Sequence, residues 1–106
     1  MKALSIKQSW ANLIAEGEKT IETRKWATDY RGSILIVSSR SPKIDLAGFA
    51  LAIADVVYCR PMTLQDETTA HCRVYPNAYA WVLQNIRKIQ PFAVRGKLGL
   101  YDVEMP

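Results

Sequence analysis

The chain has 106 residues, 49% of them hydrophobic and 23% charged, the ordinary mix of a single globular domain that needs no disulfide staples. Its net charge of +4 is a mild excess that is spread along the chain. This charge is compatible with binding of nucleic acid or of a phosphorylated small molecule, but it is smaller than that of a protein dedicated to binding duplexes. Cys59, Cys72 and His71 lack metal-ligand spacing and have too few partners to close a zinc site. We therefore expect no metal, no cofactor and reduced cysteines.

The N-terminal residues lack the apolar run of a signal peptide, and no segment is long enough to span a membrane. We expect a cytoplasmic protein without a membrane partner, and a monomer.

Residues 2–6 alternate polar and apolar side chains and predict a first strand. Ser9 is a suitable N-cap for the short helix that follows, in which Trp10, Leu13 and Ile14 would face the core.

Residues 16–26, Glu-Gly-Glu-Lys-Thr-Ile-Glu-Thr-Arg-Lys-Trp, join the end of this helix to an unusually charged strand. Gly17 can adopt the positive φ that closes a helix. From Thr20 onward, β-branched residues favour an extended, pleated backbone. The sequence therefore predicts a helix stop followed directly by a strand.

On such a strand Glu22 and Arg24 share one face and Ile21 lies on the other. If Ile21 faces the core, the two charged side chains point together toward a polar site, with Lys19 at the mouth of the strand. The alternative is that these charges are solvated, or that they form an ion-pair network with a purely structural role.

The rest of the chain reads as alternating strands, turns and one further helix. The apolar run 33–39, bounded by Gly32 and Pro42, predicts a buried central strand. The remaining predicted elements are a turn at 43–46, a long curved strand at 48–58 that ends at Pro61, a helix at 64–71 with Thr63 as N-cap and Asp66 as capping-box acid, a strand at 79–86, a connection opened by Pro91-Phe92, and a last strand at 96–103 bent at its two glycines.

Five or six strands with two or three short flanking helices predict an α+β fold. The helices are too few and too short for the crossovers of a parallel sheet, so we expect a small mixed β-barrel, whose closure would hide the strand edges. No repeat, low-complexity tract or linker divides the sequence, and we expect one domain over residues 1–106.

Several of these segments together resemble the ASCH domain family, a branch of the PUA-like superfamily. Gly17, Lys19, Glu22 and Arg24 match the family's G-x-K-x-x-E-x-R signature at every specified position. The other matching segments, in the family's order, are Leu4-Ser5-Ile6-Lys7-Gln8-Ser9-Trp10-Ala11, Tyr30-Arg31-Gly32, Ala80-Trp81-Val82-Leu83 and Gly96-Lys97-Leu98-Gly99-Leu100-Tyr101. The family commonly has proline where this chain has Ser9, which still suits a helix start.

The resemblance implies a PUA-like barrel with a cleft beside the signature strand that binds single-stranded RNA or a modified nucleoside. The residue types agree, since cations attract phosphate, amides and carboxylates hydrogen-bond base edges, and aromatic rings stack on bases. The expected roles are phosphate attraction by Lys7, Lys19, Arg24 and Arg31, base reading by Gln8 and Glu22, stacking by Trp26 or Tyr30, and further polar contacts by Ser38. Ser39 is more readily explained by strand-end capping.

The resemblance also leaves open a hydrolase, with Lys19 and Glu22 as candidate catalytic residues. Some family members are amidohydrolases of N4-acetylcytidine, whose threonine nucleophile falls where this chain has Glu22, and Glu67 lies near the region of their catalytic glutamate. A carboxylate cannot repeat the threonine chemistry unchanged. Other members are ribonucleases, for which Glu22 would serve as general base and His71 as a possible acid. We rank binding first, hydrolysis second and a purely structural ion-pair network third.

Overall fold

The structure, a computed structural model, describes residues 1–40 and 46–106. The elements follow one another as β1 (Lys2–Ile6), α1 (Gln8–Ala15), β2 (Ile21–Arg24), β3 (Gly32–Ser38), β4 (Phe49–Pro61), the 3₁₀ turn η1 (Leu64–Asp66), α2 (Glu67–Ala70), β5 (Tyr79–Ala93) and β6 (Leu100–Asp102). The six strands form one mixed sheet in the order β2-β5-β4-β3-β1-β6.

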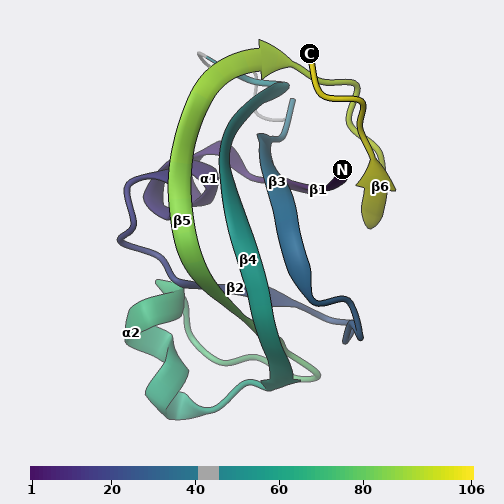
Figure 1. Ribbon diagram of the computed structural model, residues 1–106. Coiled ribbons are helices and arrows are strands. Elements are labelled where there is room, and N and C mark those ends of the chain that lie inside the picture. The colour runs from purple at the N-terminus through teal and green to yellow at the C-terminus, as the bar shows by residue number, and fades with distance from the viewer. Residues whose placement is uncertain (41–45) are drawn as a thin grey trace.

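The sheet curls around α1 into a half-barrel (Figure 1), which confirms the predicted α+β class and strand count. Within the described ranges, β2 and β6 are the two edges and do not pair with each other, so the barrel is not closed by backbone hydrogen bonds. The predicted turn at 43–46 falls on residues outside the described ranges except for Leu46, and so does Pro42.

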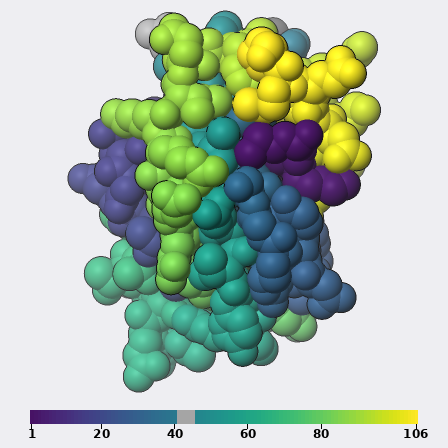
Figure 2. Space-filling model, in the orientation of Figure 1, coloured from purple at the N-terminus to yellow at the C-terminus, as the bar shows by residue number. Residues whose placement is uncertain are grey.

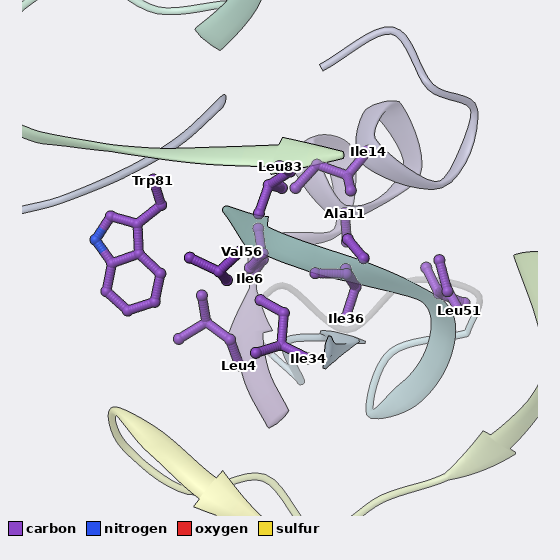
Figure 3. Packing of buried hydrophobic residues seen from close by; sticks show 12 residues of the cluster. Leu4, Ile6, Ala11, Ile14, Ile34, Ile36, Leu51, Val56, Trp81 and Leu83 are labelled. Atoms are coloured by element: carbon purple, nitrogen blue, oxygen red, sulfur yellow. The ribbon is translucent and has the colours of Figure 1, made fainter. Parts of the chain in front are cut away.

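The centre of the sheet is β3, which pairs in parallel with β1 and antiparallel with β4. Its residues from Ile34 to Ser38 are all buried, as expected for a strand with neighbours on both sides. Ala11 and Ile14 of α1 pack against the inner face of the strands (Figure 3). The parallel register brings the carboxyl ends of β1 and β3 side by side, with Ile6 opposite Ser38.

Helix α1 begins earlier than predicted. Its N-cap is Lys7, whose carbonyl accepts the Ala11 amide at 2.9 Å, while Ser9 lies exposed in the first turn. The predicted stop is confirmed: Gly17 has φ +79°, and its amide and that of Glu18 donate back to the last turn. These two bonds are a Schellman motif, which directs the chain from α1 toward β2.

The β4–β5 hairpin differs most from prediction, because β5 continues to Ala93 through Pro91. Ala52 pairs with Lys88 and Ala50 with Phe92, so two steps along β4 match four along β5. Pro91 lies in this bulge. Proline has no amide hydrogen, and at a bulge its nitrogen does not have to donate a hydrogen bond to the neighbouring strand. The expected connection at Pro91-Phe92 is therefore wrong.

The predicted last strand at 96–103 is also wrong in length. Strand β6 covers Leu100–Asp102 only, and residues 95–99 form the connection from β5 in Figure 1. Gly99 has φ +67°, a conformation outside a strand that glycine adopts without strain. The terminal segments lie side by side (Figure 2), with the Met1 ammonium donating to the Val103 carbonyl at 2.9 Å.

The short helix α2 lies at the end of the hairpin where β4 leads into β5 (Figure 1), and a clamp at Asp66 holds its start. Both guanidinium ends of Arg60 on β4 donate to Asp66, at 2.6 and 2.7 Å, and the Thr63 amide donates to Asp66 Oδ2 at 2.8 Å. The predicted capping box is confirmed. His71 ends α2 in the left-handed conformation with φ 57°.

This clamp gives the protein an acid-sensitive contribution to stability. The hydrogen bonds from Arg60 lower the pKa of Asp66 from 3.8 to about 2. A depressed carboxyl pKa stabilises the fold above pH 3.8, and this contribution is lost as the pH falls toward 2. We expect Asp66→Asn to cost about 1.5–3 kcal/mol at neutral pH. Urea unfolding at a series of pH values should show this difference shrinking below pH 3.8; a constant difference would contradict the assignment.

No helix in residues 1–40 or 46–106 is long and apolar enough to cross a membrane.

Candidate functional site

A basic cleft of about 770 Å³ opens at the carboxyl ends of the parallel strands β1 and β3. Its walls are Ser5 of β1, Arg24 of β2, residues 37–40 at the end of β3, Gly48, and residues 95–99 between β5 and β6. Carboxyl ends of parallel strands are where α/β sheets commonly place ligands, and here the sheet order brings segments distant in sequence to this edge.

The charge of the basic cleft is one-sided. Arg24, Arg40, Arg95 and Lys97 line it, and no acidic side chain is present among the described residues of its walls. The Arg40 side chain lies against Gly48, where an added Cβ would come within 3.1 Å of it. Such a surface attracts anions, and the three serines that line the cleft with it, Ser5, Ser38 and Ser39, add hydroxyl groups.

A smaller recess of about 270 Å³ adjoins the basic cleft, with which it shares Ser5, Arg24 and Ser39. The recess is also lined by a cation, an aromatic ring and a carboxylate, which belong to Lys7, Trp10 and Glu22. The recess therefore offers a different chemistry from the cleft: one hydrogen-bond acceptor and one ring, the features that recognise a base rather than a phosphate.

Glu22 is the centre of a buried ion-pair network. Its Oε2 lies 3.0 Å from Arg24 Nε, and its Oε1 lies 3.7 Å from Lys19 Nζ. Lys19 is only 1% exposed and lines neither of the two hollows, the basic cleft and the recess. Its ammonium donates to the Ala70 carbonyl at the end of α2 and lies 5.3 Å from the centre of the Trp10 ring. Lys19 thus pairs with Glu22 inside the protein, away from both the basic cleft and the recess.

Burial dominates the electrostatics of this network. It raises the pKa of Glu22 and lowers the pKa of Lys19, because each charge has left water, although the opposite charges of their partners resist both shifts. Ile21 on the opposite face packs with Met62, Ala70, Ala78 and Ala80, which fixes the orientation of β2.

Arg24 connects the two hollows. Its Nη2 donates to the Ser5 carbonyl of β1 at 2.7 Å, which ties the edge strand β2 to the other side of the barrel. Arg24 Nη1 donates no hydrogen bond to the described residues, and a quarter of the side chain is exposed. One end of the guanidinium is therefore structural and the other is available to a ligand.

The structure brings some of the predicted site residues together. Lys7, Glu22 and Arg24 line the recess, and Ser38 and Ser39 line the basic cleft with Arg24. Ser38 Oγ is buried and has no hydrogen-bond partner in the described part of the chain.

Other predicted site residues lie elsewhere. Gln8 is buried at the start of α1. The Trp26 ring meets Trp81 edge-on at 4.8 Å, the Tyr30 hydroxyl donates to the Ser33 carbonyl at 2.6 Å, and Arg31 lies over the Tyr58 ring at 5.8 Å. Trp26, Tyr30 and Arg31 line neither hollow.

The two downstream candidates have local partners. Glu67 accepts the Val74 amide at 2.7 Å, and His71 Nε2 lies 3.1 Å from the Glu18 carbonyl oxygen. Neither residue lines the basic cleft or the recess.

Sequence reasoning missed Ser5, Trp10, Arg40, Arg95 and Lys97 as site residues. The run Arg95-Gly96-Lys97 carries a usable signal, since backbone amides in a glycine-containing turn can form an anion-binding concavity beside the flanking cations, but Gly96 and Lys97 fall within the predicted last strand. Across the described ranges, no three His, Cys, Asp or Glu side chains are grouped closely enough to hold a metal ion.

Comparisons with known proteins agree with this architecture. The family model of the ASCH domain matches residues 4–93. Among solved structures, "ASCH from Zymomonas mobilis" has a TM-score of 0.76 at 15% identity, covering 97% of this chain and 87% of that one. A variant of that protein with tyrosine replaced by phenylalanine gives a TM-score of 0.72 at 14% identity, with 97% and 89% coverage.

A serine-to-alanine variant of the same Zymomonas mobilis protein gives a TM-score of 0.71 at 14% identity, covering 97% of this chain and 87% of that one. At this level of identity the likeness concerns the fold alone. No curated protein matches the sequence significantly.

Proposed function

The chain belongs to the ASCH domain family, and from this premise we propose that it binds single-stranded RNA, with phosphates in the basic cleft and one base at the recess. The observation that carries the proposal is the charge of the basic cleft, where Arg24, Arg40, Arg95 and Lys97 meet no acid among the described wall residues. Phosphate contacts supply most of the affinity of nucleic-acid binding proteins.

The recess supports a base rather than a second phosphate. Glu22 lines the recess, and its carboxylate is the kind of acceptor that an exocyclic amine of a base requires. Trp10 lies in the same recess and provides an apolar surface for the ring. A free nucleoside would use only the recess and leave the cations of the cleft without a partner.

The test is fluorescence anisotropy with a labelled mixed-sequence RNA decamer at several salt concentrations. We expect binding that weakens as salt rises, and quenching of tryptophan fluorescence that is lost in Trp10→Phe but kept in Trp26→Phe. The Trp26 variant is the matched control, because that ring was predicted to stack yet lies outside both hollows. Absence of binding at low salt, or binding indifferent to salt, would contradict the proposal.

Hydrolysis is the second candidate function, and one observation favours it. Glu22 lines the recess with a pKa raised by burial, a property of carboxylates that accept protons in catalysis. The same samples, with the RNA or N4-acetylcytidine followed by chromatography, decide between the two: product that disappears in Glu22→Gln indicates an enzyme, and binding without product indicates a recognition module.

A further inference from the structure

A pair of hydroxyl groups lies where the basic cleft meets the recess. Ser5, which lines both hollows, has its Oγ 2.6 Å from the Tyr101 hydroxyl oxygen. Tyr101 belongs to β6, is 6% exposed and lines neither hollow. The two residues are 96 positions apart in sequence, and antiparallel pairing of β1 with β6 brings them together.

The direction of this hydrogen bond follows from burial. Within residues 1–40 and 46–106, Ser5 Oγ is the only hydrogen-bond partner of the Tyr101 hydroxyl. If Ser5 donated, the phenol proton would be left unpaired inside the protein, which is costly. Burial also raises the pKa of Tyr101, so the phenol keeps its proton. Tyr101 therefore donates, and the hydroxyl proton of Ser5 is directed away from Tyr101, toward the space that Ser5 lines.

The charged side chains that line the basic cleft with Ser5 are all cations among the described residues. Arg24 Nη2 donates to the Ser5 carbonyl at 2.7 Å, which places the guanidinium beside the serine. Gly96 closes over the hydroxyl, since a Cβ there would lie 3.1 Å from Ser5 Oγ, and its neighbours Arg95 and Lys97 also line the cleft. On the side of the basic cleft, a hydroxyl donor lies next to a guanidinium and two further cations, with no carboxylate among the described wall residues, and this set matches the oxygens of a phosphate.

We propose that Ser5 and Arg24 form a phosphate subsite at the junction of the two hollows, and that Tyr101 is a positioning residue that orients the Ser5 hydroxyl toward the phosphate. The proposal deepens the RNA-binding function and rests on it. Because the subsite adjoins the recess, the phosphate it holds is attached to the nucleotide whose base lies there. The preferred ligand is then a nucleotide unit rather than a free nucleoside.

A double-mutant cycle tests the role of Tyr101, with affinity for the labelled RNA decamer as the readout. We expect Ser5→Ala and Tyr101→Phe each to weaken binding roughly three- to tenfold, the range of one hydrogen bond. The double variant should bind no more weakly than Ser5→Ala, because Tyr101 acts through Ser5. Neither change removes a charge, so the slope of affinity against salt should stay as in the wild type.

The outcomes separate this subsite from the broader function. Losses that add in the double variant, or an unchanged affinity in Ser5→Ala, overturn the subsite while leaving RNA binding intact. A wild type that binds no RNA overturns both. Competition of cytidine, its 3′-monophosphate and its 5′-monophosphate against the decamer gives an independent check: at least one monophosphate should compete better than cytidine, and equal competition by all three overturns the phosphate assignment.

Thermal unfolding of the same variants shows whether the fold is kept. Ser5→Ala leaves the buried phenol of Tyr101 without its acceptor, whereas Tyr101→Phe removes the donor and leaves Ser5 facing open space. Ser5→Ala should therefore be the less stable single variant, and adding Tyr101→Phe to it should restore part of the loss. The reverse order would contradict the inferred direction of the hydrogen bond.

Discussion

Replacement of Lys19 by methionine is expected to lower the free energy of unfolding by about 3–5 kcal/mol, the cost of breaking a buried ion pair from one side. Methionine fills nearly the same volume, so no cavity contributes. The loss arises because Glu22 Oε1 keeps its buried charge without the ammonium 3.7 Å away, and because the Ala70 carbonyl loses the donor that links β2 to α2. Urea denaturation measures it directly.

Lys88→Met is the matched control. Lys88 also forms an ion pair, with Glu16 at 2.5 Å, but both side chains are more than half exposed. Water already solvates such a pair, so its loss should cost no more than about 1 kcal/mol. If Lys19→Met proves as mild as Lys88→Met, the network is not what holds β2, and the buried lysine is better explained by chemistry at the recess.

The difference in unfolding free energy between the wild type and Lys19→Met should change with pH in a defined direction. Burial lowers the pKa of Lys19 below its ordinary 10.5, so in the alkaline range the unfolded chain binds more protons than the folded one. Stability then rises with pH between the lowered pKa and 10.5. Over this pH range the unfolding free energy of the wild type should rise relative to that of Lys19→Met. If the difference between the two falls instead, the pKa of Lys19 is not lowered.

Removal of two cations from the basic cleft is the second large effect. The double variant Arg95→Gln, Lys97→Gln should bind the RNA decamer roughly 25-fold more weakly at about 0.1 M salt, because two lost phosphate contacts each remove about 0.7 from the slope of log affinity against log salt. The slope itself should become shallower by about 1.4. Both residues are exposed, so unfolding should be unaffected.

The control removes the same net charge elsewhere. Lys2 lies at the start of β1, at the opposite end from the cleft, and Lys88 lies on β5; the ion pair that each of them forms is exposed. Lys2→Gln with Lys88→Gln should leave both affinity and slope near the wild-type values. Equal losses in the two double variants would mean that net charge, rather than the basic cleft, attracts the RNA.

The sequence by itself determined the features that depend on neighbouring residues. Gly17 predicted the end of α1 because a positive φ is cheap only for glycine, and Thr63 with Asp66 predicted the capping box because its hydrogen bonds span three residues. The apolar run of β3 predicted burial, since such a strand has no polar face. The signature from Gly17 to Arg24 predicted the family and the face that carries Glu22 and Arg24.

Only the tertiary structure decided which cations meet at one site. Arg95 and Lys97 join Arg24 because the strand order places the β5–β6 connection beside β1, whereas Tyr30 and Arg31, close to Arg24 in sequence, lie outside both hollows. The continuation of β5 through Pro91 likewise depends on a bulge opposite β4. These outcomes rest on contacts between residues distant in sequence, and local propensity carries no information about them.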